Sequence, residues 1–514
     1  MEPLFRFHST GNRSNKFNEW ASLIKYNFME NNIGKLYPSF LWTNFLNLCS
    51  IPRPSKKELQ VIAFVKKFAE NLTLKYKVDE TGNVVIQKPA SAGMEKKIPV
   101  VIQAHLDMVP QKNTATIHDF EKDPIQAYID GEWVRARGTT LGADNGIGVA
   151  AALAILQDKT LLHGPLEVLL TVDEETGMSG AFGLKPGFLS GKILLNTDNE
   201  DEGELCVGCA GGINTTAILP FRKEQIKENG SVYKISLTGL KGGHSGVDIH
   251  LGRGNANKIM IRLLWILTRK YGIKLSVYEG GTLRNAIPRE AFATVIISKD
   301  KEKLFLEDIK DFTEIIKKEF FPVEDNIKIA AETTAIPEYV IDSDSQDRFL
   351  NAVYAVPNGV MRMITEMNGV VETSTNLSII KTLNQEIEIN FLLRSSVDSA
   401  KTDLCNMIQS VFELAGAKTE HDGSYPGWKP DFNSGILTKM KQIYKNKFGT
   451  EASVKVIHAG LECGIIGDIY PGMDLISFGP TIVHPHSPDE KVEINSVGKF
   501  WDFLTETLRH IPEA

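Results

Sequence analysis

Short, almost wholly apolar segments alternate with longer helical segments through the first two hundred residues of the chain. Residues 98–103, 166–172 and 193–197 are apolar runs of strand length, whereas residues 144–157 form an apolar run of helical length. Strands that are apolar on both faces are typical of parallel sheets covered by helices on both sides. The pattern therefore predicts a largely parallel α/β sheet, preceded by a helix for which Ser55 is the expected N-terminal cap.

The pattern changes after Gly212. Residues 231–237 alternate between apolar and polar, as a half-buried antiparallel strand does, and the elements expected up to about residue 331 follow a β-α-β-β-α-β order. With 514 residues, the chain is longer than one hydrophobic core normally supports. We therefore expect an N-terminal extension (residues 1–34), an α/β domain in two segments (35–212 and 423–514) and an inserted α+β domain (213–422).

Composition excludes several classes of protein. The formal net charge is −7, so the chain has no global basic field for nucleic acid or an anionic membrane. No apolar run approaches the ~18–20 residues of a membrane span, and the N-terminus shows no apolar signal region. Five sparse cysteines indicate a reducing compartment, and we expect the cytoplasm. Cys206 and Cys209 form one CxxC pair, for which incidental spacing weighs more than a structural zinc site.

Residues of the types that bind metals follow four predicted strands, at residues 98–103, 166–172, 193–197 and 473–479, and begin one predicted helix. They are His105 and Asp107, Glu174 and Glu175, Asp198, His484 and His486 after the strands, and Asp144 at the Gly-rich helix start. In open α/β sheets, the carboxyl ends of the strands form the binding edge. Each residue alone has an ordinary explanation as a cap, turn or surface residue, but their shared placement favours one metal site.

The ligand types indicate which metal and which chemistry to expect. Imidazoles and carboxylates without thiolates suit Zn²⁺, Mn²⁺ or Co²⁺, and the excess of carboxylates suggests two ions that share a bridge. His105 and Asp107 lie two apart on a strand and point the same way, so one can bind metal while the other orients it. Of Glu174 and Glu175, one can bind metal and the other can act as a general base.

Several longer segments carry a resemblance to a known family. They are residues 103–113, 136–148, 173–177, 209–212, 239–246, 281–290, 457–464 and 479–490. Through these segments, the sequence resembles the M20 clan of co-catalytic metallopeptidases. The segments occur in the same order as in that clan, and the whole match runs from about Leu36 to the C-terminus. It is most similar to the aminoacyl-histidine dipeptidase (Xaa-His dipeptidase) subfamily. The resemblance implies a zinc-peptidase-like mixed sheet flanked by helices and interrupted by an α+β lid or dimerisation domain, two Zn²⁺ per subunit and a homodimer formed through that domain.

The resemblance also implies a role for each site residue. Asp144 would bridge the two ions, His105 and Asp198 would complete one, and Glu175 and His486 the other. Asp107 would orient His105, and Glu174 would be the general base. His484 departs from the usual pattern and leaves open which ring binds metal, although the segment after it favours His486.

Four residues would contact a small peptide substrate. The resemblance places His244 at the substrate carbonyl or carboxylate, and Asn285 and Arg394 at the terminal carboxylate. Glu462 could accept a free α-ammonium group because of its charge, and a structural role is about as plausible.

Three functions stay open from the sequence. The first is a dipeptidase that acts on peptides with a free N-terminus. The second is a deacylase of N-acyl amino acids, because both substrates present an amide to the same ligands. The third is a non-catalytic dimeric scaffold, against which the complete set of ligands and base argues.

Overall fold

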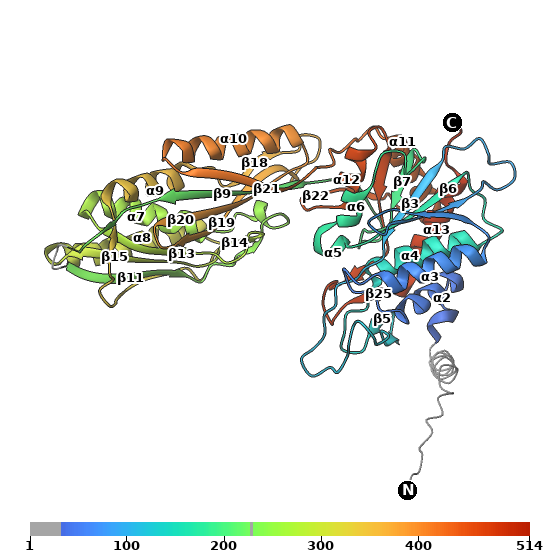
Figure 1. Cartoon of the computed structure of the whole chain (residues 1–514), viewed down its shortest axis with the longest axis horizontal. Coiled ribbons are helices and arrows are strands. Elements are labelled where there is room, and N and C mark those ends of the chain that lie inside the picture. The colour runs from blue at the N-terminus through green and yellow to red at the C-terminus, as the bar shows by residue number, and fades with distance from the viewer. Residues whose placement is uncertain (1–31, 227–229) are drawn as a thin grey trace, which may run out of the picture. The chain divides into compact units, whose positions relative to one another are not determined.

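The computed structural model describes residues 32–226 and 230–514, which divide into two compact units (Figure 1). Unit 1 contains the described residues up to Val207 together with Phe432–Lys455 and Ile469–Ala514. Unit 2 contains Gly208–Asp431 and Val456–Asp468. The predicted N-terminal extension falls outside the described residues except for its last three, which belong to a short 3-10 helix, η1 (Asn32–Lys35).

An eight-stranded sheet forms the centre of unit 1. Its strands, in spatial order, are β1 (Lys75–Val78), β2 (Val84–Lys88), β6 (Leu166–Thr171), β3 (Val100–His105), β7 (Ile193–Asn196), β23 (Asp474–Ser477), β8 (Glu204–Cys209) and β22 (Ser453–Ile457). The four strands from β6 to β23 pair in parallel, whereas β2 and β8 pair antiparallel at their sides. The expectation of a largely parallel sheet therefore holds only for the centre of the sheet.

Helices and a small second sheet complete unit 1. The helices are α2 (Ser39–Cys49), α3 (Leu59–Asn71), α4 (Ala143–Gln157), α5 (Glu174–Gly177), α6 (Ser179–Gly183), α11 (Gly435–Phe448) and α13 (Ile494–Arg509). The second sheet has the order β24 (Ile482–Val483), β25 (Lys491–Glu493), β5 (Trp133–Ala136) and β4 (Ala127–Asp130). Helix α4 packs against α2 and β3 and is buried along almost its whole length, as its continuous apolar sequence requires.

The predicted cap at Ser55 is wrong. Helix α3 begins at Leu59 after Glu58, which places Ser55 too far from the first amides of the helix. The Ser55 hydroxyl instead donates to Oδ2 of Asp107 at 2.8 Å. Its polar side chain therefore supports a strand end that carries site residues.

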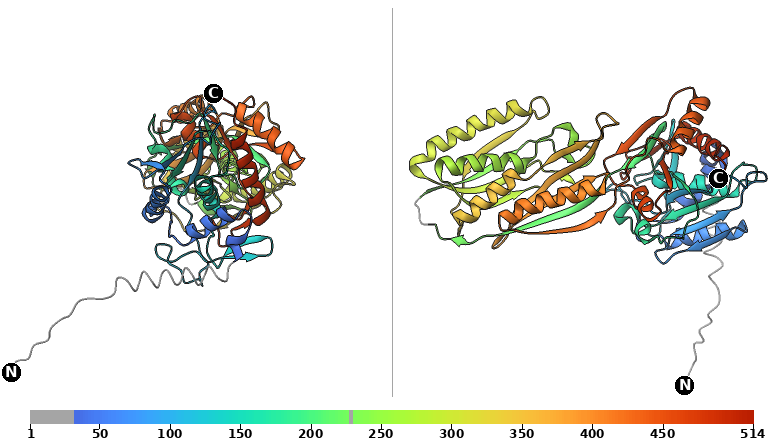
Figure 2. Two further views of the ribbon diagram at one scale, coloured as in Figure 1. Left: turned by 90° about the vertical axis from the view of Figure 1, so that its right-hand side faces the viewer. Right: turned by 90° about the horizontal axis from the view of Figure 1, so that it is seen from above.

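A nine-stranded antiparallel sheet forms unit 2 (Figures 1 and 2). Its order is β16 (Lys328–Thr333), β11 (Gly230–Thr238), β15 (Ala291–Ser298), β13 (Lys274–Gly280), β19 (Val371–Thr382), β20 (Glu386–Ser395), β9 (Gly211–Pro220) and β21 (Lys418–Tyr425), with β18 (Gly359–Met363) beside β19. Strand β15 lies between β11 and β13, which is the split βαβ arrangement that the sequence predicts.

Four long helices pack along one face of this sheet, and short elements connect the rest. The helices are α7 (Ala256–Tyr271), α8 (Glu302–Phe320), α9 (Ser343–Ala355) and α10 (Asp398–Leu414). The short elements are β10 (Lys223–Glu224), β12 (Gly243–His244), η2 (Ile249–Leu251), β14 (Ala286–Ile287), η3 (Lys299–Lys301), β17 (Val340–Ile341) and α12 (Glu462–Ile469). The apolar faces of the helices and the sheet meet in one continuous core.

Two findings bear on the expectations from composition. Within the described ranges, the helices are too short or too polar to cross a membrane. All five cysteines are buried and free of disulfide bonds, including Cys206 and Cys209.

A substitution after β23 tests how tightly unit 1 is packed around its strand ends. A Cβ on Gly479 would lie 1.8 Å from the carbonyl oxygen of Asn199, which is backbone and cannot move aside cheaply. We expect Gly479→Ala to lower the free energy of unfolding by about 1–3 kcal/mol, as overpacking does, in urea denaturation followed by circular dichroism. Gly435→Ala is the matched control, because the nearest atom to its Cβ is 3.7 Å away. Equal stability of the two variants would contradict this packing.

Candidate functional site

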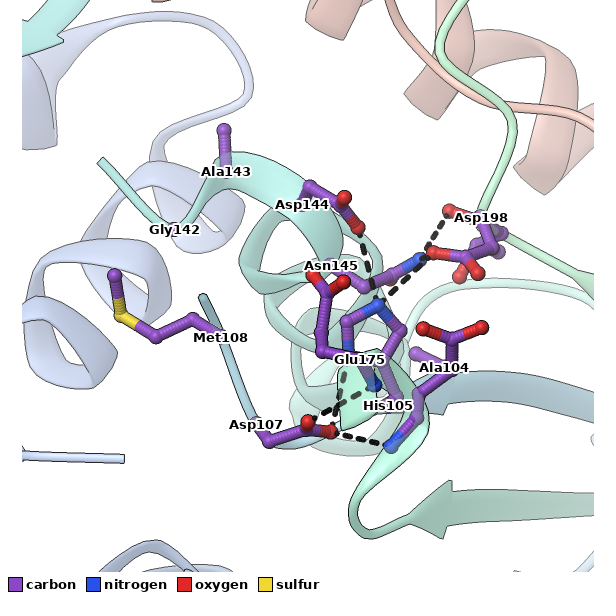
Figure 3. A network of polar contacts seen from close by, with 12 residues as sticks. Ala104, His105, Asp107, Met108, Gly142, Ala143, Asp144, Asn145, Glu175 and Asp198 are labelled. Atoms are coloured by element: carbon purple, nitrogen blue, oxygen red, sulfur yellow. Dashed lines mark hydrogen bonds and ion pairs between the residues drawn. The ribbon is translucent and has the colours of Figure 1, made fainter. Parts of the chain in front are cut away.

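The site residues of unit 1 meet at the carboxyl edge of its parallel strands (Figure 3). Strand β3 ends at His105, β6 leads into α5 with Glu174 and Glu175, and β7 leads into Asp198. Because these three strands are parallel neighbours, their ends lie side by side. Residues far apart in sequence are thereby brought to one place.

Two groups of ligand-type atoms share Asp144. In the first, Nε2 of His105 lies 3.0 Å from Oδ1 of Asp144 and 3.2 Å from Oδ1 of Asp198. In the second, Nε2 of His486 lies 3.1 Å from Oδ2 of Asp144 and 3.0 Å from Oε2 of Glu175. Asp144 thus presents one carboxylate oxygen to each group, which is the geometry of a bridging ligand.

His484 lies outside both groups. Among the described residues, each cluster able to hold a metal near Asp144 contains His486 or His105 and not His484. His484 and His486 both adopt the left-handed backbone conformation, with φ of 57° and 59°. The ring of His486 lies next to Asp144, and its role as a metal ligand stays a prediction.

Asp107 joins His105 to helix α5. Its Oδ1 lies 3.3 Å from Nδ1 of His105, on the opposite side of the ring from Asp144. The same carboxylate accepts hydrogen bonds from the backbone amides of Glu174 at 3.0 Å and Glu175 at 3.2 Å. One buried side chain therefore orients both a ring and the backbone that carries the two glutamates.

The charges of the site are strongly coupled. Burial raises the pKa of Asp107, but its hydrogen bond to His105 and the charge of that ring outweigh this effect and lower the pKa to about 2. Hydrogen bonds to Asp144 and Glu175 raise the pKa of His486 to about 11. The carboxylates thus set up a strong negative potential at both rings, and a cation placed there would be stabilised by it.

The residues fit a divalent metal. Two imidazoles and three carboxylates, without a thiolate, form a donor set suited to Zn²⁺, Mn²⁺ or Co²⁺. Oε1 of Glu175 is buried and has no hydrogen-bond partner within the described part of the chain. A buried carboxylate oxygen without a donor is costly unless a cation meets it.

A further acidic group, which we did not anticipate from the sequence, is satisfied by hydrogen bonds within the chain. Glu58, Asp107 and Asp173 lie close together and are all buried. Glu58 accepts backbone hydrogen bonds from Lys56 and Asp173, and Asp173 accepts from the hydroxyls of Thr176 and Ser179. These contacts order the turn between β6 and α6.

The sequence did not reveal three further residues around the ligands. The amide of Asn145 donates to the Asp198 carboxylate and to the carbonyl of Thr197. Arg53 and Glu490 are buried charged residues that hold backbone groups of the ligand-bearing segments. Arg53 and Glu490 stand out because charged side chains are rarely buried, and their burial is visible only in the folded chain.

The four predicted substrate-binding residues all belong to unit 2, whereas the metal-type ligands all belong to unit 1. Nη2 of Arg394 lies 3.4 Å from Nε2 of His244, and Nη1 of Arg394 donates to the Tyr425 hydroxyl at 3.1 Å. Asn285 is exposed, and Glu462 is fully buried in the first turn of α12. The structure therefore brings His244 and Arg394 together, and the roles of all four residues stay predictions.

His458 lies in the same part of unit 2. Its Nε2 is 2.7 Å from the Ser374 hydroxyl. Burial and the positive charge of Arg394 lower the pKa of His458 to about 3, so the ring is neutral at physiological pH. Burial and Arg394 also lower the pKa of His244.

Comparisons with known proteins agree with this geometry. The family model described as peptidase family M20/M25/M40 matches residues 101–510. The chain is 49% identical over 480 residues to the cytosol non-specific dipeptidase of Escherichia coli (strain K12), covering 93% of this chain and 99% of that protein.

Solved structures give the same result. The aminoacylhistidine dipeptidase from Vibrio alginolyticus matches with a TM-score of 0.91 and 50% identity, over 95% of this chain and 99% of that one. The aminopeptidase PepT from Bacillus cereus has the same fold, with a TM-score of 0.56 and 16% identity over 93% of this chain and 99% of that one. Because the family model and a relative of nearly half-identical sequence both span most of its length, the chain belongs to peptidase family M20/M25/M40.

Proposed function

We propose that this chain is a di-metal dipeptidase that hydrolyses dipeptides with a free N-terminus, with broad specificity that includes Xaa-His. The observation that carries the proposal is the pair of ligand groups that share Asp144, one oxygen to each group. The names of the Escherichia coli and Vibrio alginolyticus relatives support the substrate class.

Two Zn²⁺ ions are the proposed cofactors, with Mn²⁺ or Co²⁺ as substitutes. His105, Asp144 and Asp198 would hold one ion, and Asp144, Glu175 and His486 the other. When bound, such ions polarise a peptide carbonyl and make a water molecule more acidic.

Glu174 is the proposed general base. One carboxylate oxygen of Glu174 lies within 4.8 Å of a ring nitrogen of His105 and of a carboxylate oxygen of Glu175. The carboxylate of Asp107 accepts a hydrogen bond from the backbone amide of Glu174. Glu174 takes a proton from the attacking water and then gives it to the nitrogen of the leaving amine. The peptide C–N bond breaks, and a free amino acid is released from each side.

Unit 2 supplies the proposed contacts to the ends of the substrate. Arg394 and His244 form a donor-rich pair suited to a carboxylate or a carbonyl oxygen. We propose that Asn285 contacts the terminal carboxylate of the substrate and that Glu462 contacts its free α-ammonium group. We further propose a homodimer formed through the inserted domain and a cytoplasmic location. The name of the Escherichia coli relative, a cytosol dipeptidase, supports the location.

A substrate panel separates the dipeptidase from a deacylase. We expect the purified chain with Zn²⁺, Mn²⁺ or Co²⁺ to release amino acids from free dipeptides, including Xaa-His, and to leave their N-acetylated forms intact. Amino-acid release is measured by chromatography. Preference for N-acetylated substrates would favour the deacylase, and cleavage of neither set would favour a scaffold.

Replacing the base tests the proposed chemistry. Glu174→Gln keeps the size of the side chain but removes its basicity, so we expect kcat to fall by at least about 10²-fold, the usual minimum for general-base catalysis. Metal content measured by elemental analysis should stay near that of the parent chain. Glu80→Gln is the control, because Glu80 is an exposed carboxylate of the same unit. Near-normal turnover in Glu174→Gln would exclude this role.

Removing the bridge tests the metal centre. Asp144→Ala takes one ligand from each group, and we therefore expect both ions to be lost, as counted by elemental analysis after dialysis. Asp201→Ala, which removes an exposed carboxylate three residues after Asp198, should keep its metal. Full two-ion occupancy in Asp144→Ala would contradict the bridging role.

A further inference from the structure

The carboxylate of Glu490 is buried against the start of helix α4. It is 2% exposed and accepts hydrogen bonds from four consecutive backbone amides. They are those of Leu141 at 2.7 Å, Gly142 at 3.0 Å, Ala143 at 2.7 Å and Asp144 at 3.3 Å. The last of these amides belongs to the residue whose side chain lies between His105 and His486.

The helix itself does not hold this segment in place. Gly142 adopts the left-handed conformation with φ of 69°, and the dihedral angles of Asp144 (φ −78°, ψ 113°) and Asn145 (φ −100°, ψ 29°) are not helical. The amides at a helix start have no partner within the helix. Among the contacts of the described chain, Glu490 is the side chain that receives these four amides.

Arg53 holds the other side of the same segment. It is also 2% exposed. Its Nη1 donates to the carbonyls of Leu106 at 2.9 Å and Asp107 at 2.8 Å, and its Nη2 donates to the carbonyl of Gly142 at 2.5 Å. The planar guanidinium therefore ties the residues that follow His105 to the loop that carries Asp144.

The chain connects this pair to the third ligand-bearing segment. Glu490 stands four residues after His486, whose ring lies 3.1 Å from Asp144. The segments that carry His105, Asp144 and His486 are distant in sequence. The backbone contacts of two buried side chains, Arg53 and Glu490, thus join them.

We propose that Glu490 and Arg53 are positioning residues that hold the Asp144 backbone so that its carboxylate faces both ligand groups. The proposal rests on the metal role proposed above for Asp144. Neither side chain touches the substrate or a metal in this scheme; both act through main-chain groups of ligand-bearing segments. Preorganised ligands bind metal more tightly because less freedom is lost on binding.

Cobalt titration of the metal-free protein tests the proposal. Glu490→Gln has the same size, but its amide nitrogen faces backbone N–H groups and cannot accept from them. We expect the Kd for Co²⁺ to rise about 10- to 100-fold, the usual effect of losing a group that orients metal ligands. The visible spectrum of the bound Co²⁺ should also change, because it reports the arrangement of the ligands.

Arg53→Lys is the second variant. It keeps the positive charge but cannot donate to three carbonyls in a fixed fork, so we expect a weaker Kd and an altered spectrum here as well. Asp489→Asn is the matched control, because Asp489 is the exposed neighbour of Glu490 and pairs with Arg135. This control should titrate like the parent chain.

The outcomes separate this proposal from the proposed function. If the parent chain binds no Co²⁺, the metal centre itself fails. If the parent binds Co²⁺ and folded Glu490→Gln and Arg53→Lys show its Kd and spectrum, the metal centre stands and the positioning role is overturned. Lower thermal stability with unchanged Co²⁺ binding indicates a purely structural role and also overturns it. If one variant does not fold, the other decides, and if neither folds, the residues serve folding and the positioning role is rejected.

Discussion

Like charges gathered in a buried pocket repel one another, and this constraint governs the organisation of unit 1. Asp144, Glu175 and Asp198 converge on the rings of His105 and His486 with separations of 3.0–3.2 Å. Carboxylates that share one buried pocket cannot all stay ionised without positive charge between them. The pocket therefore favours positive charge, carried by a protonated ring or by a cation, and fixed hydrogen-bond donors surround it.

Backbone amides supply much of that compensation. Asp107 accepts the first amides of α5, and Glu490 accepts four amides at the start of α4. In both places, backbone N–H groups that lead into a helical segment stabilise a buried carboxylate. These carboxylates also fix the backbone from which Glu174, Glu175 and Asp144 project. The same interactions thus offset the cost of burial and orient the site.

The parallel centre of the sheet explains how the ligands come together. Strands β3, β6 and β7 are fully buried and largely apolar, and polar residues of the site follow where the chain leaves the sheet. The neighbouring strands β2 and β8 are antiparallel and contribute no ligand. The ligand-bearing edge is therefore confined to the parallel part of the sheet, and β23 completes it by leading into the segment with His486.

Local patterns were sufficient to predict much of this protein. The apolar runs at residues 98–103, 166–172 and 193–197 predict strands, and the polar residues directly after them predict one shared edge, because period and burial are properties of short segments. Ser55 shows where such reasoning ends. Its type suits a helix cap, but its hydroxyl bonds to Asp107, more than fifty residues away, and no local pattern encodes that contact.

By itself, the amino-acid sequence determined the types of side chain that gather at the site, their order along the strands and the interruption of one unit by another. Only the tertiary structure decided that Asp144 offers one oxygen to each ring, that His486 rather than His484 reaches it, and that Arg53 and Glu490 hold the backbone around it. The physical reason is that residue type sets which bonds a side chain can make. Which of them it makes depends on long-range packing, and a buried charge is stable only where the fold places its partners.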